Sequence, residues 1–195
     1  MADEQDQYIT PLTAEEKKQL IPSLISKDAV NAFEELNILE ARAWAVGPRT
    51  IQRIDPFSEP VIREVHKRMF NRTWGWAGKY RTTEKLNMGV PVGEIYERLG
   101  VLLGNGRYWV HNEFFLADEI AVRFHHELTV IRPFPNGNGR HARLYADIIA
   151  RKLGGDVFTW GRVHLHAGTV REKYIEALQE ADNGNIKPLL AFARS

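Results

Sequence analysis

The chain has 195 residues, of which 44% are hydrophobic and 26% charged, with no cysteine and a formal net charge of +1. This length and composition fit one folded domain and exclude a disordered chain. The absence of cysteine excludes disulfides, thiolate nucleophiles and zinc–thiolate sites. The near-neutral charge predicts no direct nucleic-acid contact. The acidic N-terminus lacks a signal-peptide pattern and no apolar run is long enough to span a bilayer, so we expect a cytoplasmic protein without membrane contact.

Helical patterns dominate the first part of the chain. We expect residues 1–12 to form a loose tail, followed by a short helix that Thr13 and Glu16 begin with capping-box spacing. A longer helix is predicted over residues 26–46, and Gly47-Pro48 is predicted to end it. A further helix follows from residue 58 through Phe70.

The middle of the chain has a different pattern. Trp and Gly alternate between Trp74 and Gly78, as expected for a compact turn, and residues 80–90 are the best candidate for a short β-hairpin. The hairpin signal is weak because no Asn-Gly or Asp-Gly turn is present. Helical spacing returns over residues 95–103, and the glycines of 104–106 are predicted to interrupt it.

The second half of the chain predicts further helices. One carries Ile120, Phe124, Leu128 and Ile131 as a core-facing stripe. Another begins after Gly139 and ends at Gly154-Gly155, and two more follow through residues 170–178 and 189–190. The chain is therefore predicted to be a single all-α domain over residues 1–195, with at most one hairpin.

The residues between the two central helices carry the chemical signal. Residues 131–143 read IRPFPNGNGRHAR. Gly137 and Gly139 allow an anion to approach the unpaired amides of a helix N-terminus. Arg140 and Arg143 are spaced to lie on the same side of the first helical turns, and guanidinium groups suit phosphate oxygens. The pattern predicts a polyphosphate site.

Two known phosphate-binding motifs and a plain connection between helices are the other interpretations of this stretch. No Gly-Lys-Ser/Thr follows and no strand precedes it, which excludes a P-loop and a Rossmann fingerprint. A plain connection between helices is the alternative, in which Asn136 caps the second helix and the arginines are solvated or paired with an acid such as Asp147.

The same residues resemble the signature of the Fic (Fido) family, His-Pro-Phe-x-Asp/Glu-Gly-Asn-Gly-Arg-x-x-Arg. The matching positions, in unbroken register, are Pro133, Phe134, Gly137, Asn138, Gly139, Arg140 and Arg143. Residues 76–81, 87–90 and 124–128 are also similar to the family, and the pattern is most similar to its subgroup called mobile mystery protein B. The resemblance implies a Fic-type helical domain with a small β-hairpin flap.

Most members of this family transfer AMP from ATP to a hydroxyl group of a protein target. The resemblance therefore implies a bacterial protein adenylyltransferase scaffold, with ATP as its substrate and Mg²⁺ as its metal. The Fic motif, residues 132–143, would bind the nucleotide through Asn136, Gly137, Asn138, Gly139, Arg140 and Arg143. The glycines and Asn138 would hold the α-phosphate and the two arginines the β- and γ-phosphates, while Phe134 would anchor the loop.

The resemblance also implies a docking surface for the protein target. Residues 80–90 would act as a flap that clamps the target segment as an added strand. The flap residues that would make this contact are Leu86, Asn87, Met88, Gly89 and Val90. By analogy with the family, the target would be a topoisomerase-like enzyme.

Two departures from the signature affect the expected activity. Arg132 stands where the family has the His that takes the proton from the attacking hydroxyl, and a guanidinium has no acceptor atom. Loss of such a base slows transfer by about 100- to 10,000-fold. Asn136 replaces the acidic residue that coordinates Mg²⁺, and its neutral amide oxygen predicts weaker metal binding. The neighbouring candidates for a replacement base are His125, His126 and His141.

Regulation and other functions are open at this point. Many Fic proteins are silenced by a Glu that pairs with the second motif arginine, here Arg143. The helix over residues 26–46 is a candidate regulatory helix, whose Glu34, Glu35 and Glu40 either reach Arg143 or remain solvated. The alternatives to an impaired transferase are a module that holds a nucleotide without transfer, and a toxin-like protein that binds an antitoxin or another inhibitory partner through its flap.

Overall fold

The structure is a computed structural model that describes residues 11–23, 26–85, 88–161 and 167–195. Within these ranges the regular elements are helices, so the prediction of an all-α fold is confirmed. In chain order they are α1 (Ala14–Lys17), α2 (Lys27–Ala45), α3 (Pro48–Arg53), α4 (Glu59–Phe70), the 3₁₀ helix η2 (Val92–Glu94), α5 (Ile95–His111), α6 (Ala117–Ile131), α7 (Asn138–Lys152), α8 (Ala167–Asp182) and α9 (Lys187–Arg194).

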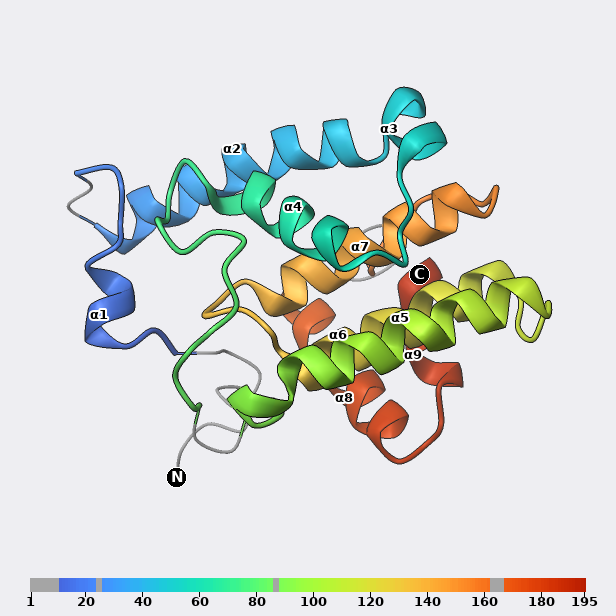
Figure 1. Cartoon of the computed structure of the whole chain (residues 1–195). Coiled ribbons are helices and arrows are strands. Elements are labelled where there is room, and N and C mark those ends of the chain that lie inside the picture. The colour runs from blue at the N-terminus through green and yellow to red at the C-terminus, as the bar shows by residue number, and fades with distance from the viewer. Residues whose placement is uncertain (1–10, 24–25, 86–87, 162–166) are drawn as a thin grey trace.

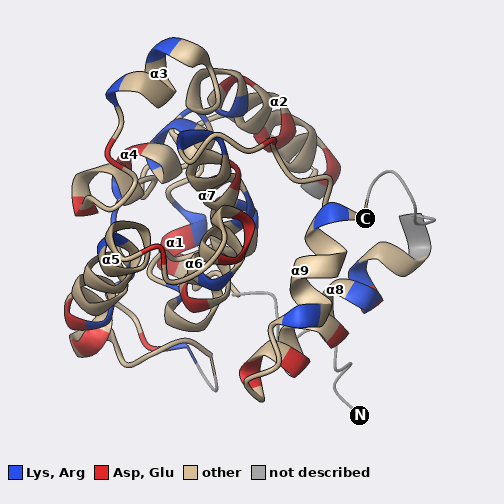
Figure 2. Ribbon diagram, turned by 90° about the vertical axis from the view of Figure 1, so that its right-hand side faces the viewer, with Lys and Arg blue, Asp and Glu red and all other residues tan. Residues whose placement is uncertain are grey.

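Helices α6 and α7 pack against each other at the centre of the fold. Helices α2 and α4 lie side by side on one flank, and α5 packs against α6 on another (Figure 1). Helices α8 and α9 form a pair to one side, where α9 contacts α6 (Figure 2). The loop between α6 and α7 therefore lies at the end of the two most central helices.

The core forms where the apolar stripe was predicted. Ile120, Phe124, Leu128 and Ile131 of α6 are all buried. The ring of Phe124 stacks on that of Tyr145 from α7, with centroids 5.4 Å apart. Burial of these large side chains is the main contribution to the stability of the fold.

Helix boundaries differ from the prediction at Asn138, where α7 begins before Gly139 and not after it, and at two further positions. Pro48 begins a short helix, α3, rather than only ending α2, because proline suits the first turn of a helix. Helix α5 continues through Gly104 and Gly106 to His111. A Cβ atom on Gly106 would lie 2.4 Å from Cδ1 of Phe57, so this glycine allows close packing instead of ending the helix.

The N-terminal segment is tied to the rest of the chain. Residues 1–10, most of the expected loose tail, lie outside the described residues. The predicted capping box is present, since Thr13 and Glu16 each bond the other's backbone amide. At residue 11 the chain is held rather than loose, because Nζ of Lys85 donates to the carbonyl of Pro11 over 2.8 Å and pairs with Glu16 over 2.6 Å.

The predicted hairpin is not formed in the part of residues 80–90 that the structure describes. No strand is assigned in 80–85 or 88–90, while Leu86 and Asn87 lie outside the described residues. The backbone amides of Arg81 and Val90 instead donate to Pro133 and Ile131, over 2.8 and 3.4 Å. The buried side chain of Arg81 also donates to the carbonyl of Val90. The backbone amides of both arms thus bond the end of α6 and the loop that follows it, while the side chain of Arg81 links the two arms.

Acidic and basic residues are both distributed over the helices (Figure 2). Several pair along one helix, as Arg123 does with Glu119 over 2.7 Å. None of the helices in the described ranges combines the length and the hydropathy needed to cross a bilayer.

Candidate functional site

The candidate site is built on the sharp loop that joins α6 to α7. Arg132 follows the last residue of α6 and Gly137 precedes α7, and both residues have a left-handed backbone, with φ of 48° and 75°. A Cβ atom on Gly137 would lie 2.5 Å from Cζ of Phe70, so both the backbone and the space favour glycine here. The loop can therefore bring the first turn of α7 against α4.

The side chain of Asn138 closes this loop. Its Nδ2 donates to the carbonyl of Phe134 over 2.8 Å, and its Oδ1 accepts from the amide of Phe134 over 3.0 Å. Asn138 is buried and begins α7. Its side chain is thus structural, and only its backbone can serve the anion hole that was predicted for it.

A buried histidine that the sequence analysis did not single out supports the loop from α4. The ring of His66 stacks on Phe134 with centroids 3.6 Å apart. Its Nδ1 accepts from the amide of Gly78 over 3.0 Å, so Nε2 carries the proton and donates to the carbonyl of Asn136 over 3.1 Å. Burial lowers the pKa of His66 well below its ordinary value and keeps the ring neutral.

The first turn of α7 presents amides that precede the helical hydrogen-bond ladder. His141 donates to the carbonyl of Gly137 over 2.9 Å. The amides of Gly139 and Arg140 come before that bond and have no carbonyl within the helix to bond. Apart from its own turn, the described residues place only Oη of Tyr174 within 4 Å of a Cβ atom on Gly139, at 3.9 Å, so they leave the space beside this turn open. Such a turn suits an anion.

The side-chain oxygen of Asn136 accepts hydrogen bonds from an amide and from a guanidinium. Its Oδ1 accepts from the amide of Gly137 over 2.7 Å and from Nη2 of Arg140 over 3.4 Å. It lies one residue before the N-cap position, which Gly137 occupies, so the predicted cap is shifted by one residue. The described residues hold no cluster of three or more His, Cys, Asp or Glu side chains suited to a metal ion. The loop thus offers Mg²⁺ no carboxylate, only a neutral amide oxygen that already accepts two hydrogen bonds.

The first motif arginine pairs with helix α2. Nη1 of Arg140 lies 2.5 Å from Oε2 of Glu34, whose other oxygen accepts from Nε1 of Trp74 over 2.5 Å. The expectation that an acid of this helix reaches Arg143 is wrong for Glu34, which is buried against Arg140. It is also wrong for Glu40, which pairs with Arg72 over 2.8 Å. Glu35 is exposed.

The second motif arginine turns toward α8. The guanidinium of Arg143 lies over the ring of Tyr174, 5.1 Å from its centroid. Arg140 contacts α2 and α4 while Arg143 contacts α8, so the two side chains flank the first turns of α7 instead of sharing one side. Neither pairs with Asp147, which is buried and pairs with Arg42 over 3.3 Å.

Arg132 lies between the loop and the flap segment. Its Nε donates to the carbonyl of Thr129 over 3.2 Å, and Nη1 lies 3.7 Å from Sδ of Met88. A Cβ atom on Gly89, which has a φ of 72°, would lie 3.1 Å from Cβ of Arg132. The described flap residues are thus packed against the position where the resemblance places the catalytic base.

The three candidate replacement bases are engaged elsewhere. Nε2 of His125 bonds Oη of Tyr174 over 3.0 Å, and that of His126 pairs with Asp182 over 2.7 Å. Nε2 of His141 bonds the carbonyl of Ile62 over 3.0 Å, and burial lowers the pKa of His141 to about 3. The structure therefore gives these rings structural contacts rather than a place beside Arg132.

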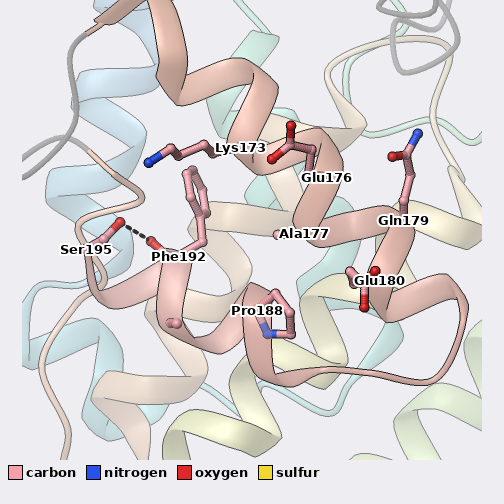
Figure 3. A pocket seen from close by; sticks show the side chains of 9 residues that line it. Lys173, Glu176, Ala177, Gln179, Glu180, Pro188, Phe192 and Ser195 are labelled. Atoms are coloured by element: carbon pink, nitrogen blue, oxygen red, sulfur yellow. Dashed lines mark hydrogen bonds between the residues drawn. The ribbon is translucent and has the colours of Figure 1, made fainter.

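A cavity of about 620 Å³ lies away from this loop, between α8 and α9 (Figure 3). It contains none of the predicted site residues. Its lining comes from the two C-terminal helices and the chain end: Lys173, Glu176, Ala177, Gln179, Glu180, Pro188, Ala191, Phe192 and Ser195.

The fold and the loop define an all-α protein in which two arginines flank the N-terminus of a central helix. Residues 56–150 match the model of the Fic/DOC family. The chain is 28% identical over 180 residues to protein adenylyltransferase Fic of Nematostella vectensis, a match that covers 91% of this chain and 40% of that protein. A protein of the same name from Aedes aegypti is 23% identical over 167 residues, or 84% of this chain and 32% of that protein. The chain thus spans about a third to two-fifths of these curated relatives.

Solved structures share the fold at lower identity. BepC of Bartonella tribocorum, crystallised with AMPPNP bound, is 17% identical with a TM-score of 0.66, over 93% of this chain and 97% of that one. The N-terminal Fic domain of a cell filamentation protein from Bartonella quintana, with ADP bound, is 16% identical with a TM-score of 0.66, over 90% of this chain and 87% of that one.

Proposed function

We propose that the chain is a nucleotide-binding Fic domain of the protein adenylyltransferase type, whose transfer step is impaired by Arg132. The observation that carries this proposal is the open first turn of α7 at Gly139, flanked by Arg140 and Arg143. Unpaired helix amides and two guanidiniums form a suitable cradle for a polyphosphate. The adenylyltransferase relatives and the AMPPNP- and ADP-bound neighbours support a nucleotide as the ligand.

Arg132 accounts for the impaired transfer. A general base must accept the proton of the attacking hydroxyl, and a guanidinium carries five donors and no acceptor. The side chain also occupies the space between Thr129 and Met88, beside the segment that would present the target. Because Asn136 is engaged with donors, no step is assigned to a metal.

The flap segment would place the target hydroxyl. Gly89 and Val90 lie against Ile131 and Arg132, so a chain that added to this segment would pass the reacting position. Main-chain hydrogen bonds of an added strand would provide affinity, and the side chains around Met88 would provide selectivity.

The test compares the natural chain with Arg132→His. Each protein is incubated with α-labelled ATP, first alone and then with a cell lysate. We expect Arg132→His to label itself or a lysate protein at least about 100-fold faster than the natural chain. Arg132→His combined with Arg140→Ala is the matched control, because it restores the base and removes a phosphate-binding charge. If Arg132→His labels nothing while it still binds ATP, the transferase proposal is wrong.

A module that holds a nucleotide without transfer is the second candidate. The observation in its favour is Arg132 itself, which adds a third cation near the loop and removes the base. Calorimetry with ATP on the natural chain tests it. Binding that Arg140→Ala abolishes, together with an inert Arg132→His variant, would favour this module over the transferase.

A further inference from the structure

Tyr174 of α8 connects three parts of the candidate site. Its ring lies under the guanidinium of Arg143, and its Oη is 3.9 Å from the position of a Cβ on Gly139. The same Oη bonds Nε2 of His125, on α6, over 3.0 Å. One side chain thus contacts the second motif arginine, borders the open turn of α7 and is anchored on the central helix.

His125, which bonds Oη of Tyr174, is held by its surroundings. His125 is fully buried on α6, and its ring also packs against Trp160 with centroids 4.8 Å apart. Burial, and then the nearby charge of Arg143, lower the pKa of His125 well below its ordinary value. A neutral, immobile imidazole fixes the hydroxyl and with it the plane of the Tyr174 ring.

The two motif arginines are held by different chemistry. Arg140 is held by the carboxylate of Glu34, which offsets its charge. In the described part of the chain Arg143 forms no ion pair, and an aromatic face orients it instead. A cation–π contact fixes a guanidinium without neutralising it. Arg143 therefore remains the stronger electrostatic partner for an incoming anion.

We propose that Tyr174 is a positioning residue, which holds Arg143 beside the first turn of α7 so that the site selects nucleotides with a β-phosphate over nucleoside monophosphates. The inference rests on the proposed function, because it takes the nucleotide to lie on α7. Arg143 is the group that touches the outer phosphates, and Tyr174 acts through it. Without the ring, the long arginine side chain samples other rotamers, and ordering it on binding opposes affinity.

The experiment measures the affinities for ATP and for AMP by calorimetry and compares their ratio. Tyr174→Leu removes the ring and Tyr174→Phe keeps it while removing the bond to His125. Leu178→Ala, one turn further along α8 at a buried position, is the matched control for loosening of that helix. Arg143→Ala shows how much of the preference for ATP the guanidinium provides. Thermal unfolding of each variant reports its loss of stability.

We expect Tyr174→Leu to lower the ATP-over-AMP preference by about three- to tenfold, from the usual strength of a cation–π contact. Tyr174→Phe should retain most of the preference, and Leu178→Ala should keep all of it despite a lower melting temperature. An unchanged preference in Tyr174→Leu, with a preference lost in Arg143→Ala, would overturn the inference alone. If the natural chain binds neither nucleotide, or Arg143→Ala keeps the preference, the proposed phosphate site itself is wrong.

Discussion

Glu34 on α2 and Arg140 on α7 are joined by an ion pair of 2.5 Å, and the carboxylate is anchored by Trp74. The pair places an acid on the first of the two arginines that the resemblance assigns to nucleotide phosphates. A phosphate that binds Arg140 must compete with this carboxylate. The α2 helix therefore has a direct physical route to lower nucleotide affinity.

Glu34→Gln tests this competition. The amide oxygen of Gln can still accept from Trp74, while the negative charge beside Arg140 is removed. We expect ATP affinity, measured by calorimetry, to rise by about 3- to 10-fold. Glu35→Gln, an exposed neighbour on the same helix, should leave the affinity unchanged. Equal affinities for the natural chain and Glu34→Gln would show that the pair is purely structural.

Asn138→Ala should destabilise the domain through its loop. The change removes both hydrogen bonds to Phe134 and leaves a buried amide and carbonyl without those partners. We expect a loss of about 1–3 kcal/mol in the free energy of unfolding for each buried group that loses its bond, measured by urea denaturation. Asn136→Ala is the control, because its Oδ1 accepts from the adjacent amide of Gly137 and from Arg140 of α7 and does not bond the backbone of Phe134. A similar loss in both variants would contradict the closing role of Asn138.

Lys85→Met should release the flap segment from the N-terminal segment. Burial alone would raise the pKa of Glu16, but hydrogen bonds from Lys85 and Thr13 lower it below its ordinary value. Without the lysine a buried carboxylate loses its partner, which costs about 3–5 kcal/mol near neutral pH. The loss should shrink as the pH falls and Glu16 takes up a proton.

The matched control for this change is Lys18→Met. Lys18 pairs with Glu15 over 2.6 Å, but both side chains are more than 70% exposed, so its removal should change stability little. Chemical denaturation at pH 7 and pH 4 measures both variants. Equal effects of the two changes, or a Lys85→Met loss that does not depend on pH, would contradict the prediction.

The buried histidines predict acid sensitivity. Burial lowers the pKa of His66 and His125 well below the ordinary value and that of His141 to about 3, so the folded rings are neutral. In the unfolded chain they take up protons near pH 6.5. Their contribution to stability is complete above that pH and is lost as the pH falls toward the folded-state values.

Unfolding measured between pH 7 and pH 5 tests this linkage. We expect the free energy of unfolding to fall with a slope of up to about 1.4 kcal/mol per pH unit for each buried histidine. His141→Gln should reduce this slope by the contribution of one buried histidine. A substitution of the exposed His111 should leave the slope unchanged. A free energy of unfolding that does not change between pH 7 and pH 5 would contradict the neutral state of these rings in the folded chain.

The sequence predicted the helices and the loop because their signals are local. The stripe from Ile120 to Ile131 and the capping box at Thr13 each depend on spacing within a few turns, and both are confirmed. The continuation of α5 through Gly106 was missed because the reason for that glycine is Phe57, which lies far away in the chain.

The parts of the site that the sequence did not predict depend on tertiary contacts. His66 lies among apolar residues of α4, and only its burial against Phe134 and Asn136 reveals its role. Glu34 neither remains solvated nor reaches Arg143, the two alternatives left open, but pairs with Arg140, because packing sets the register between α2 and α7. The hairpin was predicted from a weak pattern over residues 80–90 and from the resemblance, whereas Arg81 ties the described arms to the loop.

Hydrogen bonds of its backbone amide and carbonyl hold Arg132 in place. Its amide donates to the carbonyl of Leu128 over 3.1 Å, and its own carbonyl accepts from Nε of Arg81 over 2.8 Å. These bonds are available to any residue at this position that tolerates the left-handed backbone. The position of the loop at this point thus depends on the backbone, and the side chain can be exchanged while these two bonds remain.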